Sequence, residues 1–356
     1  MVEPRILIVG QRPDPHIEAV EARLKRLGCD TWVFDRWNPG QTATMCFGEP
    51  PAGWLTINRR RIPLDSFSAV WWRVKPARPV EFSSPDRNLS DGFALREWRS
   101  LLRCLPYFTE HALWVNPLDH HQRAELKPWQ LLLALKAGLE FPCTRITNSS
   151  DDVVKTLSAS NRVVYKTLSS FISPPDEIVF TNVVTRSAIT RSRKEIACAP
   201  GIFQKYIQKD HELRVTIINK RMTVVRIDSQ KASTTKIDWR RDQSRAMYRP
   251  GALSQTTRDR LMRFHQEAGL VFAAYDFIVT PDGREVFLEC NPGGQWLWLE
   301  RCLGLDITAQ LVDALVNDVS TSVTNDSIVR SNKPLSHEGV RRREGKGLRR
   351  KPLERS

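Results

Sequence analysis

The chain has 356 residues, of which 41% are hydrophobic and 26% are charged. These values are typical of a protein of roughly two or three domains that buries a substantial core. No apolar run approaches the roughly 20 residues that a membrane-spanning helix needs. The apolar run that begins at Ile6 is not followed by the cleavage site of a secretory signal. We therefore expect a cytoplasmic protein without a membrane segment.

The cysteines and histidines give no sign of a zinc site or a disulfide framework. The seven cysteines are scattered without a C-x-x-C pair, and the seven histidines lack the H-E-x-x-H spacing. We interpret most of the cysteines as small buried apolar residues.

The positive charge of the chain is concentrated at its end. The net charge is +14, and residues 332–356, with nine Lys or Arg and three Glu, carry +6 of it, which leaves +8 for the rest. The polar segment 321–356 is predicted to be a disordered basic tail. The remaining charge suits an acidic ligand such as a nucleotide or a peptide rich in Asp and Glu. A basic nucleic-acid-binding protein is a remote alternative, because no known binding motif accompanies the charge.

The first 115 residues predict a Rossmann-like unit. An apolar β-branched run ends at Gly10, a segment with apolar residues at helical spacing follows, and a second strand comes next, which is typical of a parallel α/β fold. The turn after Gly10 lacks G-x-G-x-x-G, so no dinucleotide site is expected there. The predicted elements are strands at 5–9, 29–34, 68–73 and 114–115, helices at 16–28 and 89–105, and turns with short strands at 38–65.

The rest of the chain alternates between helices and strands. Pro128 fits only the first turn of a helix that Gly138 ends, and Pro281-Asp282-Gly283 predicts the turn of a β-hairpin. The predicted helices are 124–138, 148–157, 256–268 and 305–315, and the predicted strands are 139–147, 161–167, 178–185, 202–207, 212–219, 221–228, 235–240, 273–279 and 285–290.

The hairpin brings oxygen-bearing side chains together. Asp276 lies in one strand, and Glu289 and Asn291 lie two residues apart at the end of its partner, so both face the same way. Two carboxylates and an amide oxygen that converge in apolar strands are suited to Mg²⁺ with room left for phosphate oxygens. The alternative is a capped Asp276 and an exposed Glu289 with no metal.

Two further segments suit a nucleoside triphosphate. Lys127 opens a helix and Lys166 ends a strand, where each could supply a point charge to phosphates, although solvated lysines at such places are common. Residues 201–215 contain two apolar strands around a polar break, which is either an interdomain hinge beside adenine or a plain hairpin. In the first case Asp210 or Glu212 would lie near the ribose, and Arg214 would face the phosphates.

The order of these segments resembles a known superfamily. Lys127 with QLLLALKAGLEFPCTRITN, Lys166, FQKYIQKDHELRV, Asp276, and Glu289 with Asn291 are similar in order to the ATP-grasp superfamily, over about residues 115–315. Within it, ELRVTII, RIDSQ, TKIDWRR and NPGGQWLWLE are most similar to the graspetide (microviridin-type) peptide cyclases and less similar to ribosomal-protein glutamate ligases.

The resemblance implies an α/β (α+β) fold, an ATP-grasp fold with an N-terminal Rossmann-like pre-ATP-grasp domain. The expected parts are a pre-ATP-grasp domain at 1–115, a central ATP-grasp subdomain at 116–200, a C-terminal ATP-grasp subdomain at 201–320, and the tail. The loop after Lys166, SSFISPPDE, lacks the glycines that cradle phosphates in many of these enzymes, and Lys205 stands where an acidic residue is usual.

The resemblance also implies ATP and Mg²⁺ as cofactors and assigns roles to residues. Lys127, Lys166 and Arg214 would bind phosphates, Asp210 would meet the ribose, and Asp276, Glu289 and Asn291 would hold Mg²⁺. The adenine hinge would be formed by Gln204, Lys205, Tyr206 and Ile207.

The implied reaction is the phosphorylation of an Asp or Glu side chain in a precursor peptide, followed by attack of a Ser or Thr hydroxyl (ω-ester) or a Lys amine (ω-amide). Arg226, Lys236 and Arg240 would join Arg214 in catalysis by binding the acidic core and stabilising the acyl phosphate, unless they form a solvated basic face. Asp238 would orient Arg240 or help to deprotonate the acceptor. The leader segment would bind near Arg186, Arg191, Arg193 and Lys194, unless these form a solvated turn.

Other readings stay open at this point. An intermolecular amino-acid or peptide ligase is the alternative within enzymes, and a homodimer is compatible with the resemblance. We interpret Trp296 and Trp298 as core or wall residues and not as stacking platforms.

Overall fold

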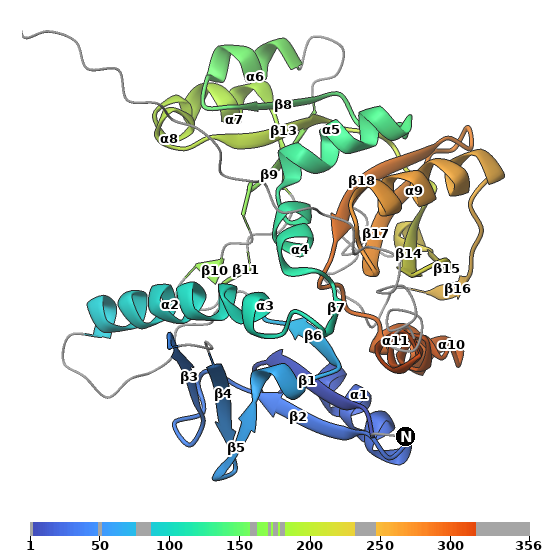
Figure 1. Cartoon of the computed structure of the whole chain (residues 1–356). Helices are drawn as coiled ribbons and strands as arrows, with labels where there is room; N and C mark the ends of the chain where they lie inside the picture. The colour runs from blue at the N-terminus through green and yellow to red at the C-terminus, as the bar shows by residue number, and fades with distance from the viewer. Residues whose placement is uncertain are drawn as a thin grey trace, which may run out of the picture.

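The computed structural model describes residues 3–48, 52–75, 87–156, 162–169, 172–173, 177–178, 182–231 and 247–317. Figure 1 shows three sheet-based parts: an N-terminal parallel sheet, a central antiparallel sheet above it, and a C-terminal antiparallel sheet beside both. Helices α4 (Leu118–Ala124) and α5 (Lys127–Ala137) run through the middle of the molecule.

The N-terminal sheet is parallel, with strand order β2-β1-β6-β7. Alternate residues of β1 point to opposite faces of the sheet and pack in two different cores. Ile6 and Ile8 pack with helices α1 (Pro15–Arg26) and α11 (Ile307–Val316), whereas Leu7 and Val9 pack with the end of α2 (Arg87–Arg103) and with a small antiparallel sheet. The predicted strands and helices of this part are confirmed. Their bounds are β1 (Arg5–Gly10), α1 (Pro15–Arg26), β2 (Asp30–Phe34), β6 (Ala69–Arg73), α2 (Arg87–Arg103), α3 (Leu105–Phe108) and β7 (Leu113–Val115), with a small antiparallel sheet of β3 (Thr42–Cys46), β4 (Ala52–Ile57) and β5 (Arg60–Pro63) and a 3₁₀ turn at Leu64–Ser66.

The central sheet is antiparallel, with order β12-β9-β13-β8, and helices α6, α7 and α8 lie on it. Its core is small and is centred on Val153, Val163, Ile189 and Phe203. The bounds are β8 (Thr144–Thr147), α6 (Ser150–Thr156), β9 (Val163–Lys166), β12 (Asn182–Val184), α7 (Arg186–Arg191), α8 (Arg193–Cys198) and β13 (Gly201–Lys205), with a short hairpin of β10 (Ile172–Ser173) and β11 (Glu177–Ile178).

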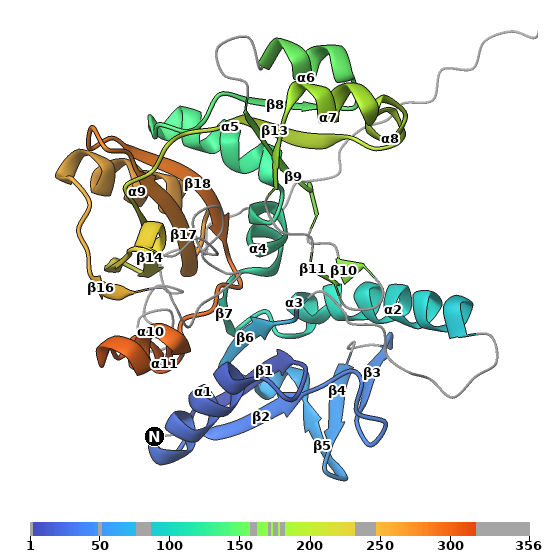
Figure 2. The same ribbon diagram turned by 180° about the vertical axis from the view of Figure 1, so that it is seen from behind.

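The C-terminal sheet has order β16-β15-β14-β17-β18. One face, which includes Val215, Tyr275 and Cys290, is covered by α5 and α9. The bounds are β14 (His211–Ile218), β15 (Arg221–Ile227), a 3₁₀ turn (Ser229–Lys231), β16 (Tyr248–Pro250), α9 (Gln255–Glu267), β17 (Phe272–Val279), β18 (Glu285–Asn291), α10 (Leu297–Leu303) and α11 (Ile307–Val316). Helix α11 returns to the N-terminal sheet and packs on α1, as Figure 2 shows from behind.

The segment between β13 and β14 joins two different sheets. β13 pairs with β8 and β9, and β14 pairs with β15 and β17, so the two strands are not a plain hairpin. Residues 206–210 belong to no strand and form the crossing. The crossing lies after β13, so the central sheet extends beyond residue 200, the end that the sequence predicts for the central subdomain.

Helices α7 and α8 occupy residues 186–198, where the sequence predicts no helix and at most a solvated basic turn. The strand predicted before them at 178–185 is found in part, as β11 and β12. Thr185 caps α7 by accepting from the Ala188 amide, and Ile189 is its only buried residue. Six-residue helices with one buried position have no apolar period that a sequence would display. No helix in the described part of the chain is long and apolar enough to cross a membrane.

Candidate functional site

A row of charged side chains crosses the face of the C-terminal sheet that α5 and α9 leave uncovered. Arg214 of β14 is directly opposite Asp276 of β17, which is opposite Glu289 of β18. The Nη1 atom of Arg214 donates to Asp276 Oδ1 at 2.9 Å, and both side chains are mostly buried. Asn291 lies two residues beyond Glu289, so its side chain leaves the same face. The predicted convergence of these residues therefore follows from the register.

The two carboxylates suit a divalent cation. Asp276 and Glu289 are like charges directly across an antiparallel pair, which is destabilising unless positive charge lies between them. Arg214 supplies part of that charge to Asp276. A β-bulge after Asp276 reorients the strand at this point. Two carboxylates and an amide fit Mg²⁺ whose other ligands are phosphate oxygens and water. In the described ranges no cluster of three or more His, Cys, Asp or Glu forms an all-protein metal site.

Helix α5 connects the carboxylates to a lysine on the central sheet. Gln130 Oε1 accepts from the Cys290 amide at 2.9 Å, and Gln130 Nε2 donates to the Cys290 carbonyl at 2.8 Å. Cys290 stands between Glu289 and Asn291. One turn earlier on the helix, Lys127 Nζ donates to the carbonyl of Thr167, the residue after Lys166, at 2.7 Å. Lys127 is therefore held at the end of β9, against the residue that follows Lys166, and α5 links that end of the strand to the carboxylates.

The crossing between the sheets has the properties expected of an adenine hinge. Gln204 is buried and donates to Thr144 Oγ1 at 3.0 Å, and the Lys205 amide donates to the Cys143 carbonyl at 2.9 Å while its side chain is exposed. The guanidinium of Arg162 lies 4.0 Å from the centre of the Tyr206 ring. Ile207 is half-buried in the stretch that belongs to neither sheet, where backbone groups could pair with a base edge.

A buried ion pair at the end of the hinge was missed in the sequence. Lys209 Nζ contacts Glu212 Oε1 at 2.6 Å, and both side chains are 8% exposed. Burial raises the pKa of Glu212, although the charge and hydrogen bond of Lys209 favour its ionised form. Glu212 is thus already paired, so the half-exposed carboxylate of Asp210 is the one of the two left facing solvent. A lysine among many basic residues gives no signal of this kind in a sequence.

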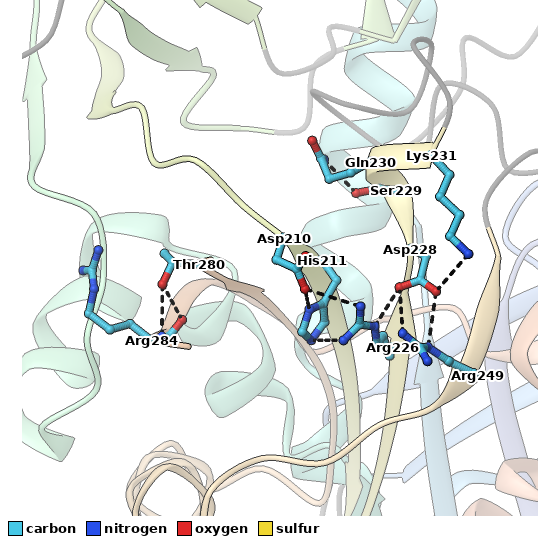
Figure 3. A network of polar contacts seen from close by, with 10 residues as sticks. All are labelled: Asp210, His211, Arg226, Asp228, Ser229, Gln230, Lys231, Arg249, Thr280 and Arg284. Atoms are coloured by element: carbon cyan, nitrogen blue, oxygen red, sulfur yellow. Dashed lines mark hydrogen bonds and ion pairs between the residues drawn. The ribbon is translucent and has the colours of Figure 1, made fainter. Parts of the chain in front are cut away.

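Arg226 lies in a different network, which Figure 3 shows. Its guanidinium contacts Asp210, His211 and Asp228, and Arg226 Nε donates to Asp228 Oδ1 at 2.7 Å. The register pairs Arg226 with Leu213, so its side chain leaves the sheet on the face opposite to Arg214. The structure therefore does not bring Arg226 together with the Arg214–Asp276 pair on one face.

The network around Arg226 concentrates positive charge. Arg249 is directly across from Arg226 on β16, and both arginines and Lys231 contact the buried carboxylate of Asp228. Burial acts to raise the pKa of Asp228, but the hydrogen bond of Arg226 and the three cations outweigh it and lower that pKa. Three cations face the two carboxylates of Asp228 and Asp210, which leaves a surplus of one positive charge that suits an acidic group.

The four cations predicted to bind a leader lie on exposed helical surface. Arg186 and Arg191 are on α7, Arg193 and Lys194 begin α8, and all four side chains are exposed. Arg193 Nη2 contacts Asp151 Oδ1 on α6 at 2.5 Å. They therefore form part of a helical surface and not a turn. The predicted catalytic residues Lys236, Asp238 and Arg240 lie outside the described residues, as does the basic tail.

Trp296 and Trp298 are packing residues, as predicted. Trp296 is fully buried and lies 5.2 Å from the Phe272 ring, and Trp298 is half-buried at 4.8 Å from the Tyr248 ring.

Comparisons of sequence find no relative: no family model matches the chain, and no curated protein matches it significantly. Comparisons of structure find many matches. A RiPP-associated ATP-grasp ligase of Chryseobacterium gregarium, solved with ADP and a leader and core peptide, matches with a TM-score of 0.77 and 25% identity over 88% of this chain and 97% of that chain. The macrocyclase MdnC of Microcystis aeruginosa MRC, bound with precursor peptide MdnA, matches with a TM-score of 0.75 and 28% identity over 88% of this chain and 99% of that chain.

A third match bears on the cofactors of such enzymes. The ATP-grasp ligase PsnB, solved with a phosphomimetic variant of a minimal precursor, Mg and ADP, has a TM-score of 0.68 and 21% identity over 89% of this chain and 99% of that chain. At that identity the match supports the fold alone.

The fold and the matches define an ATP-grasp enzyme. Within that superfamily the similarity is to the RiPP ligases and macrocyclases, as the sequence resemblance predicts.

Proposed function

We propose that this enzyme closes rings in a ribosomal precursor peptide by forming ω-esters or ω-amides between its side chains. The observation that carries the proposal is the row Arg214–Asp276–Glu289 with Asn291 at its end, linked through α5 to Lys127 beside Lys166. We also propose that the reaction takes place in the cytoplasm.

The proposed reaction has two steps. A carboxylate oxygen of a peptide Asp or Glu attacks the γ-phosphorus of ATP, and the bond from that phosphorus to the bridging oxygen breaks, which yields an acyl phosphate and ADP. A Ser or Thr hydroxyl or a Lys amine then attacks the acyl carbon, loses its proton, and expels inorganic phosphate. In phosphoryl transfer the protein mainly positions groups and offsets charge.

The residues of the site suit these two tasks. Lys127 and Lys166 would hold phosphates as point charges, and Arg214, paired with Asp276, would offset charge on the transferred group. Asp276, Glu289 and Asn291 would hold Mg²⁺, which neutralises phosphate charge when bound. Gln204, Lys205, Tyr206 and Ile207 would line adenine, and Asp210 would meet the ribose.

The peptide would meet cations in two places. Arg226, Arg249 and Lys231 surround Asp228 and would attract the acidic core, together with Lys236 and Arg240. Asp238 would orient Arg240 or help to deprotonate the acceptor. The exposed cations Arg186, Arg191, Arg193 and Lys194 would contact the leader.

Mass spectrometry of the peptide product tests the proposal. Small acidic peptides rich in Thr or Lys that are encoded beside this chain would be incubated with the enzyme, ATP and Mg²⁺. We expect the loss of one water per ring, and we expect Asp276→Asn to lower the rate of ring closure by about 100-fold or more, because a charged Mg²⁺ ligand is lost. Asp282→Asn changes an exposed carboxylate in the turn of the same hairpin and should stay within about twofold of the parent enzyme.

The outcomes separate the competing functions. A gain of mass on a free amino acid with ATP turnover would establish an intermolecular ligase in place of ring closure. Equal rates for Asp276→Asn and Asp282→Asn would remove the proposed metal site.

A further inference from the structure

The loop 292–297, which follows Asn291, is held almost entirely by side chains from distant parts of the chain. The carbonyl oxygens of residues 292 to 295 each accept a hydrogen bond from a side-chain N–H group. The amides of Trp296 and Leu297 donate to a single imidazole nitrogen, His16 Nε2, at 3.0 and 3.3 Å. Three of these four partners come from the N-terminal part of the chain: His16 from α1, Arg73 from β6, and Asn116 directly after β7.

Two N-terminal side chains hold the first half of the loop. Asn116 Nδ2 donates to the Pro292 carbonyl at 3.2 Å and to the Phe272 carbonyl at 2.9 Å. Arg73, at the end of β6, donates from Nη1 to the carbonyls of Gly293 at 2.6 Å and Gly294 at 3.0 Å. The loop is thus fixed from β6 and β7, which lie about 200 residues earlier in the chain.

Asp14 makes this arrangement possible. Its Oδ2 atom accepts from Arg73 Nε at 3.0 Å, so a guanidinium that is only 2% exposed has a paired charge. Its Oδ1 atom contacts His16 Nδ1 at 3.1 Å. Because backbone amides can only donate, His16 Nε2 must accept, and the proton of the neutral ring lies on Nδ1 toward Asp14. One carboxylate therefore orients both the arginine and the histidine.

The other side of the loop contacts the site. The Gly293 amide donates to Asn291 Oδ1 at 3.0 Å, which sets the orientation of the side chain predicted to hold Mg²⁺. The Gln295 carbonyl accepts from Arg214 Nη2 at 3.3 Å. A Cβ atom on Gly294 would lie 2.4 Å from Ala274 Cβ and 3.0 Å from Arg214 Nη2, so only glycine permits this approach.

We propose that Asp14, Arg73 and His16 are positioning residues that set the geometry of the Mg²⁺–nucleotide site through the loop 292–297. The inference rests on the proposed function only in assigning Asn291 and Arg214 to that site. Arg73 holds two consecutive carbonyls in place, and Gly293 then fixes the amide side chain of Asn291. Residues from the N-terminal part of the chain thereby control the geometry of a metal site whose three proposed ligands all belong to the C-terminal sheet.

The test compares Arg73→Met with the parent enzyme in the full chain. Binding of ADP is measured by calorimetry with Mg²⁺ and with a chelator. We expect the Mg²⁺-dependent affinity to fall by about 10-fold or more, as for other residues that orient metal ligands. Binding without Mg²⁺ should stay within about twofold, because the lysines and the hinge are untouched. Higher Mg²⁺ should restore part of the turnover, which it would not do for a general loss of structure.

Hydrogen exchange provides a readout that does not need the bound metal. In Arg73→Met the amides of 293–297 should exchange about 10-fold faster, while β1 and α1 keep their protection. Val20→Ala is the matched control: it removes buried volume from α1 in the same core, but the Val20 side chain makes none of the hydrogen bonds that hold the loop. It should leave the exchange of the loop and the Mg²⁺-dependent affinity unchanged. If Arg73→Met does not fold, Arg73→Lys replaces it, because one ammonium cannot reach Asp14 and both carbonyls together.

The outcomes are decisive. Unchanged exchange in the loop, or equal losses of affinity with and without Mg²⁺, would overturn the proposal. If the parent enzyme itself binds no Mg²⁺–ADP, the proposed function fails, and the exchange rates of 293–297 still decide whether Arg73 holds the loop.

Discussion

At the scale of single residues, Lys209 and Glu212 form an ion pair where the hinge enters β14. Glu212 is two residues before Arg214. The pair is buried, and the pKa of Glu212 is raised by that burial despite its partner. A carboxyl whose pKa is higher in the folded than in the unfolded state favours folding at low pH. That contribution is lost as the pH rises through the folded-state pKa. Lys209 reduces this loss of stability, because its positive charge stabilises the ionised form of Glu212.

Replacing Lys209 should therefore lower the free energy of unfolding by an amount that depends on pH. We expect Lys209→Met to lower the free energy of unfolding by about 3 kcal/mol at neutral pH, because it leaves a buried carboxylate unpaired. The cost should be smaller in mild acid, where Glu212 takes up a proton. Urea unfolding of the apo enzyme at the two pH values measures both quantities.

The double variant Lys209→Met with Glu212→Gln is the control. It removes both charges and should recover most of the stability at neutral pH. Equal destabilisation by Lys209→Met at both pH values would show that Glu212 does not ionise against burial.

The sequence predicts some residues of the site and not others. Asp276, Glu289 and Asn291 could be grouped because a hairpin turn and two-residue spacing place them together, and these are local signals. Arg73, His16 and Asn116 contact a loop more than 150 residues away, and no local pattern carries such a contact. The face on which Arg226 lies needs the register of β14 and β15, which periodicity alone does not supply.

At the scale of elements, α5 has a second function beyond covering the sheet. Gln130 makes three hydrogen bonds from inside the helix, two to Cys290 and one from Nε2 to the Ala124 carbonyl at 2.6 Å. The strand that carries Glu289 and Asn291 is therefore bonded to the helix that carries Lys127. A substitution in the middle of α5 should therefore alter binding at the proposed nucleotide site.

The variant Gln130→Met tests this connection. It keeps the length of the side chain but loses all three bonds, so we expect about 3 kcal/mol lower stability and weaker binding of Mg²⁺–ADP. Chemical denaturation and calorimetry measure the two effects. Lys136→Met on the exposed side of the same helix should change stability by less than about 0.5 kcal/mol. A loss of stability with intact nucleotide binding would contradict the link.

Elements with strong periodicity or clear end signals could be predicted, and short ones could not. Helix α5 has Pro128 in its first turn and ends at Gly138, which has a φ of 77° that favours glycine. Helix α9 begins after the cap Ser254. In contrast, α7 and α8 are too short to show a period. The membership of β13 in the central sheet depends on pairing with strands far away in the sequence.

At the scale of the whole molecule, residues at the carboxyl ends of the parallel strands contact another part of the same chain. Ligands of open α/β folds bind at the carboxyl ends of the strands. Here Asp14 follows β1, Arg73 ends β6, and both serve the loop 292–297 of the same chain. Under the proposed function, a Rossmann-like unit without a dinucleotide fingerprint would contribute to the nucleotide site by holding this loop in place.

Charge is the other property of the whole molecule, and the last prediction concerns where it acts. The proposed acidic peptide would be attracted by the cations of the body, such as the group around Asp228, and by the tail, which holds +6 of the net +14. We expect direct contacts with cations in the body to dominate, because at 0.1 M salt a charge acts mainly within the Debye length of about 10 Å. An enzyme shortened to residues 1–331 should therefore keep its KM for the peptide within about twofold and keep most of the rise of that KM with salt. Steady-state kinetics of both forms at low and high ionic strength measure this. If the KM of the shortened enzyme no longer depended on salt, the tail and not the body would be the part that attracts the acidic peptide.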